Sequence, residues 1–401
     1  MNQPANSLPR LAIVLSHPTQ YYSPWFRWLR HHTPLQFRVF YLWDFGVTTR
    51  HDPKFQTAFQ WDVDLLSGYD HEFVPNRSRA PGAETFRGFD NPGLTTQVAA
   101  WRPDALLLFG YKWASHLRAI AWARWRRLPI VFRGDSHLLG RGLPPMASRL
   151  VLRVLYSQFA AVTYVGAANR DYFTAFGVPQ RRLFFAPHSV NHELFGATPS
   201  SARDAAALRA ELGLAPGTLV VLFAGKFVPA KQPRELLEAF LALNLPDAAL
   251  VFVGDGPEKK TLLALADRAP AGRVQFLPFA NQTEMPARYL LANLFVLPSR
   301  GHYETWGLAV NEAMHMGVPA LVSDLVGCQR DLVTDRETGW IFRANDSAHL
   351  REQLAVALAT LADSVAREKI RAAVATRIAG YTFVQTTAGL LAALTSLRRA
   401  P

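Results

Sequence analysis

Short apolar runs alternate with helix-like stretches along most of this chain of 401 residues, and this alternation constrains the fold more than any other feature. Brief apolar runs bounded by turn signals are typical of strands buried on both faces of a parallel sheet. They lie at residues 11–15, 37–42, 105–109, 130–132 and 161–165 in the first half, and at 219–224, 249–253, 274–277, 294–297 and 320–322 in the second. Two consecutive doubly wound α/β units with parallel sheets are therefore predicted.

Helix-like stretches fill the spaces between these runs, as parallel strand connections require. They span residues 24–31, 93–101, 113–127 and 167–176, and then 233–243, 259–268, 308–316 and 348–361. Glycine, proline and serine interrupt the pattern near residues 191–216, which predicts a junction there. We therefore expect Rossmann-like domains at 1–190 and 191–380, with a C-terminal helix at 381–401 packing back toward the first domain.

Composition indicates a well-packed globular protein, because 49% of the residues are apolar and 18% are charged. A single cysteine, Cys328, excludes an internal disulfide bond and suits a reducing compartment. The first apolar run is short and ends at the polar Ser16 and His17, so no secretory signal is expected. No apolar run approaches the ~20 residues needed to span a bilayer, and a cytoplasmic location is the expectation.

The net charge of +12 favours anionic partners, and part of it is concentrated between residues 101 and 153. This region has ten Lys or Arg residues, two acids and four tryptophans. Its helix-like stretch 113–127 either lies in a membrane interface or packs on the sheet with its arginines in water. Residues 112–153 are thus a candidate for contact with the inner face of a membrane. No recognition motif accompanies the charge, and a nucleic-acid partner is not expected.

The segment 298–320 carries most of the functional information. A polar loop follows the apolar run 294–297 and leads into the helix-like stretch 308–316, with Glu304 in the loop and Glu312 in the helix. Free N–H groups and the positive dipole end make such a helix start an anion site. Acids bind phosphate poorly but accept hydrogen bonds from sugar hydroxyls. These features predict a nucleotide sugar as ligand, and the alternative is two solvated acids.

Other segments of the second unit indicate the same ligand. Gly225 allows a sharp turn after an apolar run, and Lys226 and Lys231 supply positive charge for a diphosphate. Phe279 follows another run and would hold a flat base. The backbone N–H groups that precede the helix at 308–316 would bind the diphosphate, namely those of Thr305, Trp306 and Gly307. Because open parallel sheets bind ligands beyond the carboxyl ends of their strands, the site is expected between the two units.

The order of these pieces resembles the family 4 retaining glycosyltransferases, which have the GT-B fold. The resemblance is strongest over residues 185–345 and rests on Gly225-Lys226 with Lys231, on residues 253–257 (Val-Gly-Asp-Gly-Pro), on Pro298-Ser299, on Glu304 with Glu312, and on residues 317–319 (Gly-Val-Pro). It implies a glycosyltransferase whose first domain binds the acceptor and whose second domain binds the nucleotide sugar.

The resemblance also implies roles for single residues of the second domain. Glu312 would accept hydrogen bonds from the nucleotide ribose, and Glu304 would lie near the transferred sugar. Lys226 and Lys231 would contact the diphosphate. Many relatives have arginine at the first of these two positions, so the bidentate geometry of arginine is lost there.

The first domain departs from the family pattern after its first apolar run. Residues 16–24 replace the glycine-rich loop of many relatives, and His17, Gln20 and Tyr21 are candidates for contact with an acceptor sugar. The alternative is a packed loop. Residues 187–191 read Pro-His-Ser-Val-Asn where relatives commonly have Pro-Asn-Gly-Val-Asp, and this departure leaves a substrate role there open.

A second group of candidates follows the apolar run 130–132. In the family this strand end supplies a polar group, often histidine, beside the sugar that is transferred. Asp135 is the first candidate and His137 the second. The structural alternative is an ion pair between Arg133 and Asp135.

The resemblance implies transfer with retention by front-face displacement, in which the leaving diphosphate helps to deprotonate the acceptor hydroxyl. No metal or other cofactor is expected, because Asp62 and Asp64 do not follow a hydrophobic strand and the histidines lack metal-ligand spacing. The expected acceptor is a glycan or lipid-linked hydroxyl in bacterial surface polysaccharide or glycoconjugate synthesis. A sugar-nucleotide 2-epimerase of the same fold and a noncatalytic glycan- or membrane-associated subunit stay open as alternatives.

Overall fold

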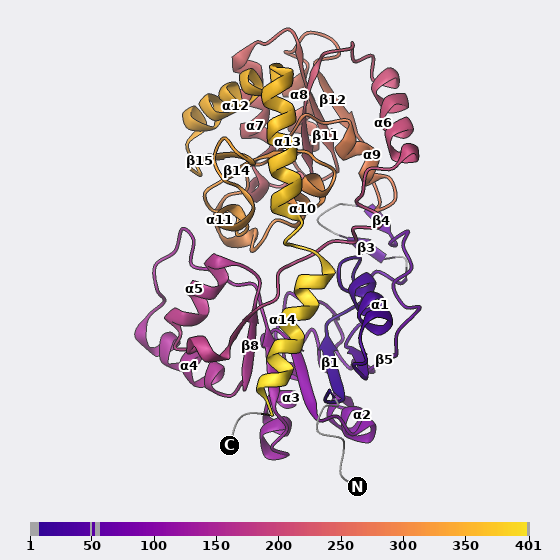
Figure 1. The fold of residues 1–401 in the computed structure, drawn as a ribbon, viewed down its shortest axis with the longest axis vertical. Helices are drawn as coiled ribbons and strands as arrows, with labels where there is room; N and C mark the ends of the chain where they lie inside the picture. The colour runs from indigo at the N-terminus through magenta and orange to yellow at the C-terminus, as the bar shows by residue number, and fades with distance from the viewer. Residues whose placement is uncertain (1–7, 49, 53–56, 399–401) are drawn as a thin grey trace.

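The computed structural model describes residues 8–48, 50–52 and 57–398, which form two α/β units stacked along the long axis of the molecule (Figure 1). The first sheet has the strand order β5-β2-β1-β6-β7-β8-β9, and the second has the order β12-β11-β10-β13-β14-β15. Neighbouring strands of both sheets run parallel. The predicted α/β class with two doubly wound parallel sheets is confirmed.

Every predicted apolar run coincides with a strand, and all but one of these strands are largely buried; the exception is the half-buried run 274–277, which forms an edge strand of the second sheet. The strands of the first unit are β1 (Leu11–Leu15), β2 (Phe37–Tyr41), β5 (His71–Phe73), β6 (Ala105–Phe109), β7 (Ile130–Arg133), β8 (Ala161–Tyr164) and β9 (Leu183–Phe185), with a separate antiparallel pair β3 (Arg50–Asp52) and β4 (Thr57–Phe59). Those of the second unit are β10 (Leu219–Ala224), β11 (Ala248–Val253), β12 (Val274–Leu277), β13 (Leu294–Leu297), β14 (Ala320–Ser323) and β15 (Gly339–Phe342).

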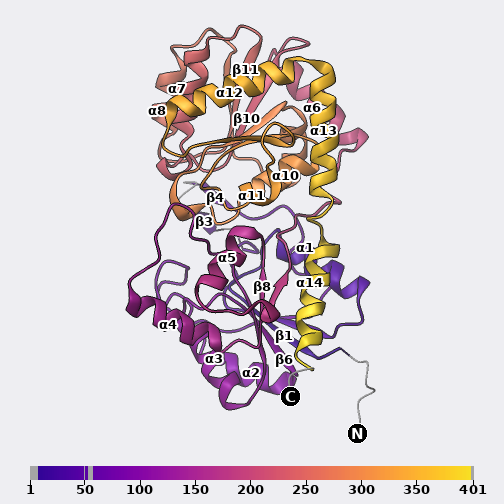
Figure 2. The same cartoon turned by 60° about the vertical axis from the view of Figure 1, so that its left-hand side comes forward.

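Helices cover both faces of each sheet (Figures 1 and 2). The first unit contains α1 (Tyr22–His32), α2 (Leu94–Trp101), α3 (Ala114–Trp125), α4 (Met146–Ser157) and α5 (Ala167–Ala175). The second contains α6 (Pro199–Glu211), α7 (Pro233–Leu243), α8 (Lys259–Ala266), α9 (Met285–Leu290), α10 (Leu308–His315), α11 (Gln329–Leu332), α12 (Ser347–Ala362) and α13 (Ser364–Ile378). Short 3-10 turns occupy η1 (Gln180–Arg182), η2 (Pro229–Lys231) and η3 (Gly301–Tyr303).

The stretch 191–216, predicted to interrupt the pattern, contains the helix α6. The Thr198 side chain accepts a hydrogen bond from the N–H of Ser201, and Pro199 occupies the first turn. Proline at that position begins a helix instead of breaking one, because its missing N–H would have no intrahelical partner there. The prediction that proline interrupts the pattern in this stretch was therefore wrong for Pro199.

The last helix returns to the first unit. α14 (Phe383–Ser396) packs against β8, β9 and α1, and the indole N–H of Trp25 donates a 2.9 Å hydrogen bond to the Thr387 hydroxyl (Figures 1 and 2). Among the described residues, Ser364–Ser396 is long and apolar enough to cross a membrane, and half of its most apolar window is buried inside the fold. α13 packs on the helices α10 and α12 of the second unit, whereas α14 covers the strands β8 and β9 of the first.

The basic, tryptophan-containing stretch 113–127 corresponds to α3, which packs against the first unit. His116, Ala119, Ile120 and Ala123 are buried along one face. Trp125, near its C-terminal end, is 75% exposed. The packed-helix interpretation therefore holds for most of α3.

Candidate active site

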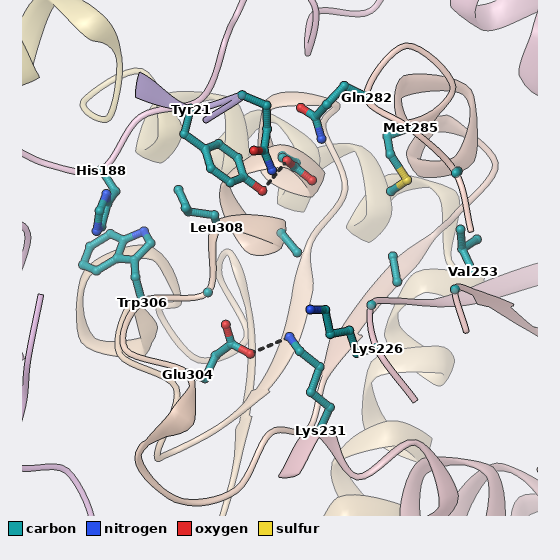
Figure 3. A pocket seen from close by; sticks show the side chains of 18 of the residues that line it. Tyr21, His188, Lys226, Lys231, Val253, Gln282, Met285, Glu304, Trp306 and Leu308 are labelled. Carbon is teal, nitrogen blue, oxygen red and sulfur yellow. Dashed lines mark hydrogen bonds and ion pairs between the residues drawn. The ribbon is translucent and has the colours of Figure 1, made fainter. Parts of the chain in front are cut away.

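A cavity of about 570 Å³ lies between the two units (Figure 3). Its second-unit wall comes from the ends of β10 and β11, from the loop after β12 with α9, and from α10 with the loop before it, while the first unit adds the loop before α1 and the loop after β7. This is the position that the carboxyl ends of parallel strands predict. The cavity lining brings together eleven of the predicted site residues, namely Gln20, Tyr21, Asp135, Lys226, Lys231, Phe279, Glu304, Thr305, Trp306, Gly307 and Glu312.

Glu312 lies inside α10 and is only 4% exposed. Its carboxylate accepts a hydrogen bond from the Tyr21 hydroxyl at 3.0 Å (Figure 3). It accepts another from the Tyr289 hydroxyl at 2.7 Å. Burial raises the pKa of Glu312 to about 7, although hydrogen bonds from Tyr289, Tyr21 and Gln282 oppose the shift. The carboxylate therefore faces the cavity as a buried acceptor whose present partners are the two phenol groups and the side chain of Gln282.

Glu304 and Lys231 form an ion pair of 2.7 Å at the other end of the cavity (Figure 3). The Ser299 hydroxyl donates to the same carboxylate oxygen at 3.1 Å. Gly225 has a φ of +150°, a conformation that favours glycine, and it brings the backbone beside the Lys231 side chain. Lys226 lines the cavity from the same turn, so two cations and one carboxylate meet where β10 ends.

The loop before α10 joins the two units. Gly307, at the N-cap, has a φ of +103°, and Leu308 and Ala309 of the first helical turn line the cavity. The first N–H groups of a helix have no intrahelical partner. The Thr305 hydroxyl donates a 2.8 Å hydrogen bond to Asp135 of the first unit. The indole of Trp306 donates to Asn311 at 2.7 Å, which fixes the loop against its own helix. The arrangement suits an anion bound at a helix start.

Asp135 and His188 form the first-unit side of the cavity. The His188 Nε2 atom lies 3.8 Å from an Asp135 carboxylate oxygen, beyond hydrogen-bond distance. Burial alone would raise the pKa of Asp135, but His188 and the Thr305 hydroxyl hold it below its usual value. Burial lowers the pKa of His188, and Asp135 opposes this. At neutral pH the site therefore presents a carboxylate next to a neutral imidazole.

The expected alternative of an Arg133–Asp135 ion pair is wrong. The guanidinium of Arg133 donates to the backbone carbonyls of Ala186 (2.8 Å) and Pro187 (3.3 Å), in the segment that crosses to the second unit. Arg133 therefore holds the segment that crosses between the units, and Asp135 lines the cavity without an ion pair to Arg133.

Two predicted residues lie outside the cavity lining. His137 is 2% exposed, and its Nδ1 atom accepts the N–H of Leu139 at 3.1 Å. His17 packs edge-on against Trp43 and Phe45, and burial lowers its pKa to about 4. His17 therefore belongs to a packed loop, which was the alternative to contact with an acceptor sugar.

The lining residues that the sequence missed or left open include Tyr22, His188, Gln282 and Tyr289. His188 lies in the interdomain segment, at a position where relatives commonly have asparagine. That difference was the one feature of the sequence that could have indicated a role for His188 in the site. The two tyrosines gave no signal because each belongs to a helix whose apolar side is buried.

The two aspartates considered for metal binding serve as hydrogen-bond acceptors. Asp62 accepts from the N–H groups of Gln282 and Thr283 at 3.1 Å, which links the two units. Asp64 accepts from Leu66 and Ser67 and pairs with Arg27 at 3.3 Å. Within the described part of the chain, no group of three or more His, Cys, Asp or Glu side chains could hold a metal ion.

Comparison with known sequences gives a family match to the glycosyl transferases group 1 over residues 204–372. The D-inositol 3-phosphate glycosyltransferase of Nocardia farcinica is 28% identical over 358 residues, which cover 79% of this chain and 76% of that protein. The GDP-mannose-dependent alpha-(1-6)-phosphatidylinositol monomannoside mannosyltransferase of Mycolicibacterium smegmatis is 31% identical over 226 residues, covering 54% of this chain and 57% of that protein.

Solved structures share the fold at low sequence identity. Anabaena Alr3699/HepE in complex with UDP and glucose has a TM-score of 0.70 and 18% identity, covering 97% of this chain and 100% of that chain. A glycosyltransferase from Rickettsia africae has a TM-score of 0.74 and 11% identity, covering 98% and 99%. The two-domain architecture is that of the GT-B glycosyltransferases.

Proposed function

We propose that this chain is a glycosyltransferase that moves a sugar from a nucleotide-diphosphate sugar to a hydroxyl group of a glycan or lipid-linked acceptor, with retention of configuration. The match of residues 204–372 to the glycosyl transferases group 1 and the similarity to curated glycosyltransferases support this proposal. The observation that carries the donor assignment is the convergence of Lys226, Lys231 and the α10 start on one cavity that also holds Glu312. Cations and free N–H groups suit a diphosphate, and a buried carboxylate suits ribose hydroxyls.

The donor would lie along the second-unit wall. Lys231, Lys226 and the N–H groups of residues 305–307 would hold the diphosphate, and Glu312 would bind the ribose after exchanging its bond to Tyr21. Phe279 lines the cavity next to Gln282 and Met285, where the base would fit. Glu304 would face the transferred sugar from its ion pair with Lys231.

The acceptor hydroxyl would approach from the side of Asp135 and His188. In front-face displacement, the bond from the anomeric carbon to the diphosphate oxygen breaks, and the acceptor oxygen bonds to the same face of that carbon. The acceptor proton passes to the leaving diphosphate. Lys226, Lys231 and the helix start would stabilise the charge that develops on that diphosphate, which is an electrostatic contribution. We propose that this chemistry needs no metal ion.

A thermal-shift screen of UDP-, GDP-, ADP- and dTDP-sugars, repeated with a chelator, tests the donor assignment. One nucleotide class should raise the melting temperature, and the chelator should leave that shift unchanged. Proton NMR of the transfer product should show the anomeric configuration of the donor. A protein stabilised by none of the four nucleotide classes would overturn the assignment, and an inverted product would overturn retention. Formation of a new sugar nucleotide from the donor alone would indicate the 2-epimerase. Binding of the donor without transfer to any acceptor would indicate the noncatalytic subunit.

We also propose that the protein works in the cytoplasm at the inner face of the membrane, in assembly of bacterial surface glycans. The support is α4, whose outer side is apolar. Met146, Leu150 and Val154 recur at intervals of four residues and are 72%, 62% and 57% exposed. α4 contains Arg149 and Arg153 and no acidic residue, a composition that suits an anionic lipid surface.

Vesicle sedimentation tests the membrane proposal. The protein should sediment with vesicles that contain phosphatidylglycerol, and less with vesicles of phosphatidylcholine alone. Leu150→Glu should abolish sedimentation, whereas Val365→Glu, at a 77% exposed position of α13, should not. Equal sedimentation of both variants would contradict a docking role for α4, and a dimer that only Leu150→Glu disrupts would indicate that a second copy covers this face.

A further inference from the structure

A second cavity of about 220 Å³ adjoins the active-site cavity on the first-unit side. The two cavities share Tyr22, Asp135 and His188. The remaining wall belongs to the first unit and includes Ser16, Gly110, Lys112, Trp113 and Arg133. A ligand in the second cavity would therefore meet the donor sugar at Asp135 and His188.

Arg133 is a buried cation in this wall. The residue is 3% exposed, and its Nε atom has no hydrogen-bond partner. Its Nη atoms donate to carbonyl groups, and among the described residues no carboxylate lies within ion-pair distance of it. The faces of Tyr22, Trp25 and Phe109 lie about 6 Å away, at 5.9, 5.9 and 6.0 Å. A buried cation without a counterion is costly, which makes this wall favourable for an anion.

Lys112 adds a second positive charge at the mouth. It is exposed, and its Nζ atom lies 6.0 Å from the ring centre of Trp113. Gly110, with a φ of +85°, turns the chain at the end of β6 toward these residues. The carboxylate of Asp135 also lines the cavity, but it is engaged by Thr305 and faces His188.

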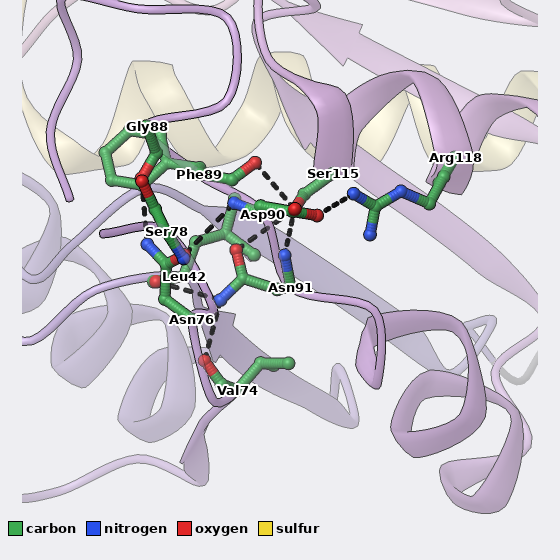
Figure 4. Close-up of polar contacts among 10 residues, drawn as sticks. All are labelled: Leu42, Val74, Asn76, Ser78, Gly88, Phe89, Asp90, Asn91, Ser115 and Arg118. Atoms are coloured by element: carbon green, nitrogen blue, oxygen red, sulfur yellow. Dashed lines mark hydrogen bonds and ion pairs between the residues drawn. The ribbon is translucent and has the colours of Figure 1, made fainter. Parts of the chain in front are cut away.

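The wall that carries Lys112 and Trp113 is fixed from behind. The Ser115 hydroxyl donates to the carbonyl of Phe89 and accepts the N–H of Asn91, and Asn91 donates to the carbonyls of Leu42 and Val74 (Figure 4). This buried network holds the start of α3 against the ends of β2 and β5. The two side chains before α3 are thus presented by a rigid element, as a binding site requires.

We propose that this second cavity binds an anionic group of the acceptor, a phosphate or phosphodiester on a polyol, and that it thereby selects charged acceptors. The inference rests on the proposed transferase function. Arg133 and Lys112 would hold the anion, Trp113 would cover the apolar face of the polyol, and a hydroxyl of the polyol would point toward Asp135 and His188.

Calorimetry with defined probes tests the inference. Glucose 6-phosphate represents a free phosphomonoester, glycerophosphoinositol represents a lipid headgroup, and glucose is the uncharged probe. At least one phosphate probe should bind about tenfold more tightly than glucose, and Lys112→Ala should remove most of that difference. Arg126→Ala is the matched control, because it removes one exposed cation outside the cavity lining. The titrations are repeated with saturating UDP and GDP and in Lys231→Ala, so that phosphate bound at the donor site is recognised.

Equal affinity for glucose and both phosphate probes would overturn the inference, as would phosphate binding that Lys112→Ala leaves unchanged. Arg133→Lys supplies a second measurement. It keeps the charge and loses the planar guanidinium, so it should weaken phosphate binding, and melting curves recorded beside the titrations measure how far the loss of a bond to the Ala186 or Pro187 carbonyl lowers stability. If the protein bound no nucleotide, the proposed function would be wrong. The titrations without nucleotide would still test whether the second cavity binds phosphate.

Discussion

The hydroxyl of Tyr21 donates a 3.0 Å hydrogen bond to Oε1 of Glu312, across 291 residues of sequence and between the two units. Tyr289 donates to the other oxygen of the same carboxylate at 2.7 Å. A ribose hydroxyl that binds Glu312 has to replace Tyr21 or share its acceptor. Under the proposed function, donor binding would be coupled to the contact between the units, because Glu312 would bind the ribose and also bonds to Tyr21 of the first unit.

The buried Glu312 should make stability fall as the pH rises. Its pKa in the folded protein is about 7, against 4.5 for a free carboxyl, because burial disfavours the charged form. Below about pH 4.5 the carboxyl is protonated in both the folded and the unfolded protein, and the free energy of unfolding has its full value. The unfolded state then loses its proton first, and the stabilisation declines until the pH passes about 7.

Glu312→Gln removes this titration and supplies the comparison. Between about pH 5 and about pH 8 the wild type should lose on the order of 2–3 kcal/mol of unfolding free energy relative to the variant. Urea unfolding of both proteins at several pH values measures the difference. A pH-independent difference would show that the carboxyl titrates normally. Glutamine is preferred to alanine here because alanine would leave both tyrosine hydroxyls without an acceptor.

Tyr21→Phe should tighten binding of the nucleoside diphosphate. The variant removes the hydroxyl that competes for Glu312, and a hydrogen bond to a charged group contributes about 1 kcal/mol or more, so a gain of about fivefold in affinity is expected. Calorimetric titration with UDP or GDP measures it. Weaker binding in the variant would mean that the Tyr21 hydroxyl contacts the nucleotide. Tyr22→Phe is the control, since Tyr22 lines the cavity without touching Glu312.

Lys231→Ala should lower turnover by about 10²–10³-fold, because a cation at the leaving diphosphate acts on the transition state. Lys231→Arg should recover part of the activity. Lys259→Ala is a matched control that breaks another lysine–carboxylate pair, 2.6 Å long, outside the cavity lining. Initial rates and melting curves are measured for all three. Wild-type turnover in Lys231→Ala would remove Lys231 from the diphosphate site.

Asp135→Asn should lower kcat and leave the KM for the donor nearly unchanged, because Asp135 lies on the first-unit side of the cavity. It should also lower the pKa of His188 further, since the nearby carboxylate opposes the effect of burial. NMR titration of His188 and steady-state kinetics test the two effects. Asp267→Asn, at an exposed position, is the control. An unchanged His188 pKa would show that the 3.8 Å contact does not persist in solution.

Much of the second-unit site could be read from local patterns. Gly225 and Gly307 mark turns that need positive φ values, and Lys226, Lys231 and Glu304 follow strands whose carboxyl ends meet at one edge of the sheet. The first-unit candidates were less well determined. His17 and His137 have the side-chain chemistry of a site, but both pack beneath it, because a loop sequence does not say which side chains turn inward.

The two parallel sheets, and the candidate anion site at the end of the second, follow from the amino-acid sequence alone, because short apolar runs form buried strands and glycines permit the turns that follow. The tertiary structure decided which polar groups meet across the units. It placed Tyr21 on Glu312, Thr305 on Asp135, and Arg133 on the crossover carbonyls instead of on Asp135. Such pairs join residues far apart in the chain, so no local periodicity records them, and the packing of the two units selects them.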